Sequence, residues 1–141
     1  MRTLHICLSI FVLSGIGIRP SNAEEINTRA LNEVSQEFAI CRGYFTLIAL
    51  CLDPAKDANV AQRYRSSADQ FATVTFQFGK AAGLSDAALL ARATLAFKQV
   101  QTETDKDCRN IAVVLEKYSD RCSGMAKDVE GTIRGIMQRV K

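Results

Sequence analysis

VSQEFAICRGYFTLIALCL, from Val34 to Leu52, is the stretch of sequence that decides the fold. Its apolar positions recur in steps of three and four residues, so they form one continuous stripe along a helix. Counted from just before the quoted segment, the stripe consists of Leu31, Val34, Phe38, Cys41, Phe45, Ile48 and Leu52. A stripe this apolar needs other protein surface to cover it. We therefore predict that a helix from Glu24 to Leu52 is the core against which the rest of the chain packs.

A second helix is predicted from about Pro54 to Ala82. Asp53 can cap its start, and a proline in the first helical turn sacrifices no hydrogen bond. Gly83 is well placed to end it in the left-handed conformation, and Ser85 to cap the helix that follows. Gly43, in the middle of the first helix, is either a weak point or a place where another helix comes close.

The helical spacing continues from Ser85 to the C-terminus without a proline. A single helix of that length would extend about 80 Å at 1.5 Å per residue, so a compact domain requires a break. The break can lie in the polar run 102–107 or in the segment 119–124, which contains Ser, Asp and Gly. We favour the second, which gives helices 86–119 and 124–140. The expected fold is all-α: a small antiparallel bundle of three long helices plus a C-terminal helix.

The cysteines indicate that this bundle is stapled by disulfides. Four follow the N-terminal leader, namely Cys41, Cys51, Cys108 and Cys122, and an even number in an exported chain is typical of two disulfides rather than buried thiols. Two cysteines ten residues apart on one intact helix are separated by about 15 Å, too far to bond. Both bonds must therefore join the first helix to the C-terminal half. We favour Cys41–Cys108 with Cys51–Cys122, whereas a break near residue 104 would invert the pairing.

Residues 1–23 have the pattern of a cleaved export signal. Arg2 lies in a short positive start, Ile6 to Ile18 is uncharged and apolar, and Ala23 follows a small-residue segment of the kind that a signal peptidase reads. An uncleaved N-terminal membrane anchor is the alternative. The rest of the chain, 24–141, is expected to be a single helical domain, periplasmic or secreted, without a transmembrane segment.

The charge balance gives no reason to expect a nucleic-acid partner. The chain contains 18 Lys and Arg against 15 Asp and Glu. Arg2 and Arg19 belong to the leader, so 16 cationic residues remain in the domain, against the same 15 acidic ones. Nucleic-acid binding would need a concentrated basic face.

Few catalytic arrangements remain available to this sequence. The only histidine, His5, lies in the leader, which excludes His-dependent nucleophilic catalysis and His–metal sites in the domain. Glu33 and Glu37 lie one helical turn apart and are expected to be solvated. The acidic run 103–107 lacks the glycine and glutamate of a calcium loop. We expect no enzyme activity, no metal and no cofactor.

The C-terminal segment is the one candidate interaction surface. Lys127, Arg134 and Lys141 recur every seven residues, and Gly131 with Gly135 forms a small-residue pattern that permits close helix contact. The leading hypothesis is an exported, non-enzymatic protein of a bacterial cell envelope that binds another macromolecule, most simply a protein. Two alternatives stay open: membrane-surface association through this amphipathic helix, and carriage of a small apolar ligand beside the aromatic pairs Tyr44–Phe45 and Phe76–Phe78.

Overall fold

A computed structural model describes residues 22–52, 55–105 and 108–140. Within these ranges the protein is an all-α bundle of five α-helices and one short 3-10 helix. The elements are α1 (Asn22–Cys51), α2 (Ala58–Ala81), α3 (Asp86–Thr102), η1 (Cys108–Asn110), α4 (Ile111–Lys127) and α5 (Val129–Arg139). The predicted export signal falls almost entirely outside the described residues, as do Asp53, Pro54 and Lys141.

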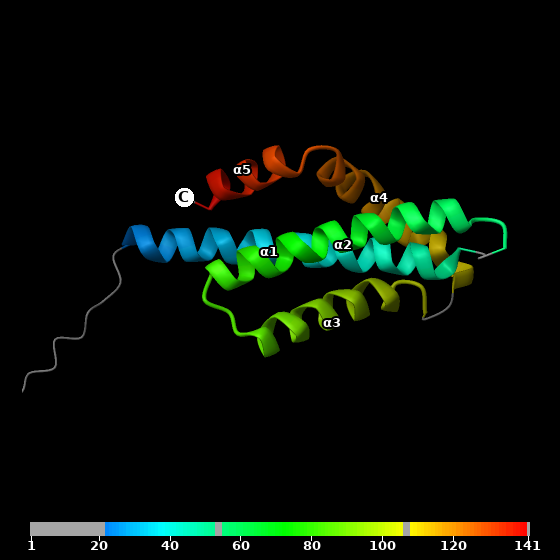
Figure 1. The fold of residues 1–141 in the computed structure, drawn as a ribbon, viewed down its shortest axis with the longest axis horizontal. Coiled ribbons are helices and arrows are strands. Elements are labelled where there is room, and N and C mark those ends of the chain that lie inside the picture. Colours follow the sequence, from blue (N-terminus) through cyan, green and yellow to red (C-terminus); the bar gives the residue numbers. More distant parts are fainter. Residues whose placement is uncertain (1–21, 53–54, 106–107, 141) are drawn as a thin grey trace, which may run out of the picture.

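Helix α1 is the centre of the bundle. It contacts each of the other four α-helices, with α2 alongside it, α3 on one side and α4 and α5 on the other (Figure 1). Five members of the predicted stripe are buried, and so are residues on its remaining faces, including Ser35, Ala39, Tyr44 and Leu47. A helix that is covered nearly all round must be apolar nearly all round. The prediction of a core helix over this segment is therefore confirmed.

Aromatic packing joins α1 to α2. The ring centroids of Phe38 and Phe71 are 4.8 Å apart, and those of Phe45 and Phe71 are 5.2 Å apart in an edge-on arrangement. The buried hydroxyls near this contact are satisfied, because Ser35 donates to the carbonyl of Thr75 at 2.8 Å and Thr75 donates to that of Phe71. These contacts fix the α1–α2 hairpin as a rigid pair.

The connection from α2 to α3 is as predicted. Gly83 has a φ of +84°, and Ser85 caps α3 by accepting a hydrogen bond from the Ala88 N–H at 3.2 Å. The start of α2 lies later than predicted, at Ala58. Gly43 is a place of close approach: a Cβ there would lie 3.1 Å from backbone atoms of Ala96 and Phe97. The missing side chain lets α3 lie directly on α1.

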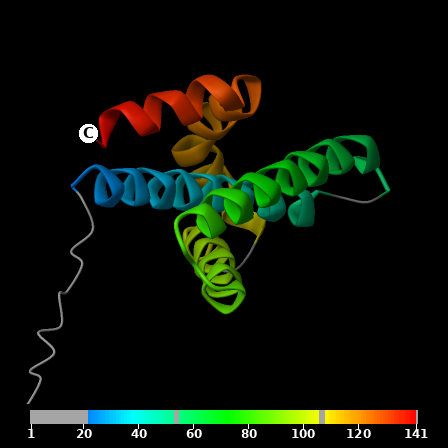
Figure 2. The ribbon, with the colours of Figure 1, turned by 60° about the vertical axis from the view of Figure 1, so that its left-hand side comes forward.

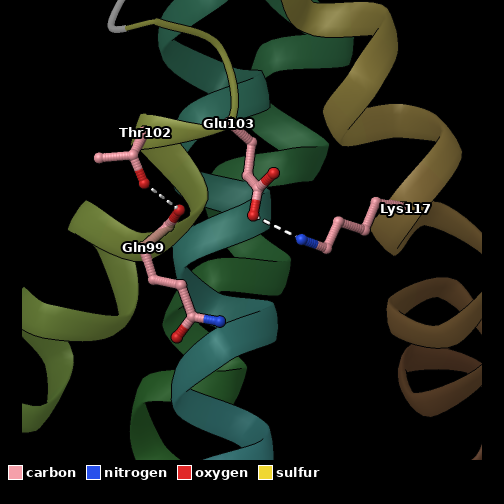
Figure 3. A network of polar contacts seen from close by, with 4 residues as sticks. All are labelled: Gln99, Thr102, Glu103 and Lys117. Atoms are coloured by element: carbon pink, nitrogen blue, oxygen red, sulfur yellow. Dashed lines mark hydrogen bonds and ion pairs between the residues drawn. The ribbon is translucent and has the colours of Figure 1, made fainter.

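The predicted third helix, 86–119, is wrong, because α3 ends at Thr102. The Thr102 and Thr104 hydroxyls donate to carbonyls three residues earlier, and Asp105 has a φ of +54°, a conformation that Asp tolerates and that terminates a helix. Lys117 of α4 then pairs with Glu103, fastening the next helix beside this turn (Figure 3). The favoured break at 119–124 is wrong as well, since α4 runs through it.

A second break, which the sequence analysis did not predict, separates α4 from α5 at Asp128. The side chain of Asp128 accepts a hydrogen bond from the Gly131 N–H at 2.8 Å and so caps α5. The expected helix 124–140 is therefore two helices. Lys127 belongs to the first of them and Arg134 to the second, so the predicted seven-residue basic line does not follow one helix.

The favoured disulfide pairing is also wrong. The bonds join Cys41 to Cys122 and Cys51 to Cys108. This is the pairing expected for a break near residue 104, because the chain then returns antiparallel to α1 and meets the end of that helix first. The prediction that both bonds connect the first helix to the C-terminal half is confirmed.

Candidate binding groove between helices α2 and α4

An open groove of about 520 Å³ runs between α2 and α4 over the middle of α1. Its lining combines an aromatic floor, small hydroxyls and two cations, contributed by Phe45, Arg63, Tyr64, Ser67, Ser123, Ala126 and Lys127. None of these residues is acidic. The groove therefore offers positive charge and apolar surface side by side.

The floor is held in place by the core. Phe45 is buried against Phe71, and its ring centroid lies 6.0 Å from that of Tyr64. Tyr64 also meets Tyr44 edge-on at 6.5 Å. Burial, reinforced by the neighbouring Tyr64, raises the pKa of Tyr44 to about 12. The phenol beneath the groove thus stays neutral at any physiological pH.

The wall formed by α4 is fixed to α1 covalently. Cys122 and its partner Cys41 are both fully buried, and Met125 Sδ lies 3.5 Å from Cys41 Sγ. Lys127 follows Cys122 by little more than one helical turn. Because the disulfide sets the position of this turn, the wall is preorganised, which lowers the ordering cost of binding.

Both cations of the groove are available to a ligand. Arg63 and Lys127 are exposed, and within the described part of the chain neither forms an ion pair. Two cations of α4, by contrast, are engaged in ion pairs with other elements. Arg121 pairs with Glu37, and Lys117 with Glu103. The pKa of Lys117 is raised, chiefly by its hydrogen bond to Glu103. The groove thus combines two unpaired cations with an aromatic floor.

The predicted interaction residues fall in two separate places. Lys127 lines the α2–α4 groove, whereas Arg134 borders a second, more apolar groove of about 400 Å³ between α5 and the start of α1. There Arg134 already faces Glu130 at 3.7 Å, one turn earlier on the same helix. Lys141 lies outside the described residues.

Among the described residues, no other helix packs closely against Gly135, so the small-residue pattern is not used there. A Cβ there would have one neighbour within 4 Å, the Arg139 guanidinium. At Gly131 the space of a Cβ is filled by the Asp128 carboxylate. Gly131 thus serves the cap of α5, and its role toward a partner stays a prediction.

Sequence reasoning placed Glu37 on a solvated surface, but it is half-buried and paired with Arg121 of α4. Burial lowers the pKa of Arg121, while the nearby Glu33 acts in the opposite direction. This pair joins α1 to α4 and is structural. The sequence analysis did not predict this ion pair, because Glu37 and Arg121 lie 84 positions apart in the chain.

No protein-family model, curated protein or solved structure matches the chain. Among the described residues no helix is long and apolar enough to cross a membrane. Nor do three or more His, Cys, Asp or Glu side chains gather there in a way that could hold a metal ion.

Proposed function

We propose that this chain is an exported, non-enzymatic binding protein of a bacterial cell envelope, and that it holds an acidic segment of another protein in the α2–α4 groove. The observation that carries the proposal is the pair of unpaired cations, Arg63 and Lys127, beside the aromatic floor of Phe45 and Tyr64. Carboxylates of the partner would pair with the cations, and an apolar side chain would cover the rings.

The two disulfides support the proposed compartment, because such bonds form and persist in oxidising environments. They also support the proposed mode of action. A scaffold whose helices are tied together presents a surface of constant shape, and rigid surfaces lose less entropy when they bind. Nothing in this mode requires a reacting group.

The binding test uses the oxidised protein and a fluorescein-labelled peptide of alternating Glu and Phe residues, followed by fluorescence anisotropy. We expect saturable binding that weakens as salt is raised, since the contact includes exposed ion pairs. Arg63→Glu and Lys127→Glu should each weaken binding several-fold, because each replaces an exposed attraction by a repulsion. Arg65→Glu is the matched control, because Arg65 is an exposed cation of the same helix that borders a different groove.

Equal losses in the control and in the two groove variants would mean that only net charge matters, and would refute the groove as the site. A peptide in which Gln replaces Glu separates the contributions of charge and aromatic surface. If it binds as tightly as the acidic peptide, the cations have no role and the proposal fails.

The groove between α5 and α1 supports carriage of a small apolar ligand as a second candidate. Ile26, Ile133 and Met137 line it, and Ile26 is 38% exposed although it is apolar. A solvatochromic apolar dye should then bind the oxidised protein and be displaced by aliphatic alcohols. Ile133→Asp should abolish the signal, and an unchanged signal would remove this candidate.

A further inference from the structure

Helix α3 presents an outward face that no other part of the described chain covers. The helix packs on the bundle through Leu89, Ala93, Ala96 and Val100, which are buried, and it projects from the bundle in Figure 2. On the solvent side Leu90 is 60% exposed and Leu95 is 64% exposed. These two leucines are among the most exposed large apolar side chains of the described residues.

This face is also free of charge over most of its length. Between Asp86 and Lys98 the only charged residue is Arg92, and its guanidinium turns back to α1. Arg92 Nη2 lies 2.6 Å from the Asn32 side-chain oxygen, and Nη1 lies 3.3 Å from the Asn32 carbonyl. The outward surface between the two end charges therefore consists of Leu, Ala and Thr side chains.

The leucines flank a ridge of small residues. At 3.6 residues per turn, Leu90 and Leu95 are about 140° apart around the helix, and the exposed Ala87, Ala91 and Thr94 lie between them. Each leucine borders a shallow groove between α3 and α1. One groove, of about 270 Å³, contains Leu90, Thr94 and Phe97, and the other, of about 360 Å³, contains Leu95, Ala88 and Ala91.

We propose that a second copy of this chain covers the face, with the two α3 helices antiparallel about a two-fold axis that passes between Arg92 and Ala93. The small ridge lets the helices approach closely. In this register Leu90 of each copy lies at the level of Thr94 and Phe97 of the other, above the first groove. Leu95 of each copy lies at the level of Ala88 and Ala91, above the second. The groove bordered by Leu90 thus receives Leu90 of the other copy, and the groove bordered by Leu95 receives the other Leu95, as an isologous interface requires.

The charges at the ends of the face are complementary to those of a second copy in this antiparallel arrangement. Lys98 of one copy comes to the level of Asp86 and Ala87 of the other, so opposite charges meet at both ends of the helix pair. A parallel pair would bring Asp86 to Asp86 and Lys98 to Lys98. Asp86 already pairs with Lys80, but both side chains are solvent-exposed, so the Asp86 carboxylate remains accessible to Lys98 of the other copy. The interface is one helix wide, so the dimer should be weak and dependent on concentration.

Sedimentation equilibrium of the oxidised protein over a wide concentration range tests the proposal. We expect a monomer–dimer equilibrium. Leu90→Glu and Leu95→Glu should each raise the dissociation constant at least tenfold. Val113→Glu should leave it unchanged; Val113 is an exposed apolar residue of α4, outside the proposed interface. Circular dichroism establishes that the variants remain helical.

A charge exchange tests the antiparallel register. Lys98→Asp places two carboxylates together at each end and should weaken the dimer about two- to thirtyfold, because the symmetric dimer loses two exposed ion pairs. Adding Asp86→Lys to this variant should restore the affinity. A protein that remains monomeric at all concentrations, or a double variant that stays as weak as Lys98→Asp, would overturn the proposal. A monomer that binds phosphatidylglycerol vesicles through Leu90 and Leu95 would overturn it too and would assign the face to lipid.

Discussion

The disulfide between Cys51 and Cys108 lies at the protein surface, where Cys108 is exposed and Cys51 is half-buried. The other disulfide, between Cys41 and Cys122, is entirely buried. Thiol–disulfide exchange requires a thiolate to reach one of the sulfur atoms. The two bonds therefore differ in access although both tie α1 to the C-terminal half.

We predict that mild reductant opens Cys51–Cys108 first. Brief treatment of the native protein with dithiothreitol, followed by alkylation and peptide mapping, should label Cys51 and Cys108 while Cys41 and Cys122 remain bonded. In denaturant both bonds should open together, because the chain no longer shields either one. Early labelling of Cys41 in native buffer would contradict the packing described around it.

Gly43→Ala should destabilise the protein by about 1–2 kcal/mol, even though alanine favours a helix by about 1 kcal/mol over glycine. The added Cβ would press on backbone atoms of Ala96 and Phe97, which cannot move unless α3 moves. Gly124→Ala is the matched control, because a Cβ at Gly124 meets nothing within 4 Å. It should stabilise the protein by about 0.5–1 kcal/mol. Urea denaturation measures both, and the same sign for both would be inconsistent with close α1–α3 contact.

Tyr118→Phe should leave stability unchanged or raise it by about 1 kcal/mol. The Tyr118 hydroxyl is buried and has no hydrogen-bond partner among the described residues. Removing it relieves an unsatisfied group and keeps the ring beside Tyr44, at a centroid distance of 6.3 Å. Tyr118→Ala, which empties the site, should lose about 3–5 kcal/mol. Thermal unfolding distinguishes the two, and a large loss in the phenylalanine variant would reveal a partner for the hydroxyl.

Alkaline pH should destabilise the fold through Tyr44. Its pKa is about 12 in the folded protein, against an ordinary value of 10.0, because burial disfavours the phenolate. The neutral form is therefore the one that folding favours. This contribution is complete below pH 10 and is lost as pH rises from 10 to 12. Unfolding temperatures measured from pH 8 to 12 should fall over that interval, and less steeply in Tyr44→Phe. Equal slopes for both proteins would exclude Tyr44 as the cause.

Asp128→Ala should loosen α5 alone. The carboxylate caps the helix through the Gly131 N–H, and such a cap contributes about 1 kcal/mol. Hydrogen exchange should become faster in residues 129–139 and stay unchanged in α2 and α3. Asp128→Asn retains an acceptor and should exchange nearly as slowly as the original protein.

The periodicity of the sequence predicted the elements whose signals are local. The α1 stripe, the Gly83–Ser85 connection and the coupling of α1 to the C-terminal half follow from spacing and turn chemistry. The position of the break does not follow from local signals, because Ser119, Asp120 and Gly124 are common in turns and yet α4 continues through them, anchored by the buried Cys122. The residues that do end α3 are Thr102, Thr104 and Asp105, which lie in the other segment considered for the break, 102–107.

The groove and the outer face of α3 were beyond sequence reasoning for a physical reason. Arg63 and Lys127 become neighbours only when α2 and α4 flank α1, and that arrangement depends on where the chain turns back. The one usable local signal that was missed is Asp128 followed by Val129 and Glu130, which is typical of a helix start.

The two disulfides also form one covalent ring inside another, since 51–108 lies within 41–122. A protease that cuts once in any connection inside the inner ring, before α2, between α2 and α3 or after α3, releases no fragment, because both bonds still hold the two pieces together. Among the described helices, the first part of α1, the end of α4 and the whole of α5 extend beyond the outer ring. A cut between the cysteines should therefore leave the α2–α4 groove assembled, whereas trimming from the C-terminus past Lys127 should remove one of its two cations.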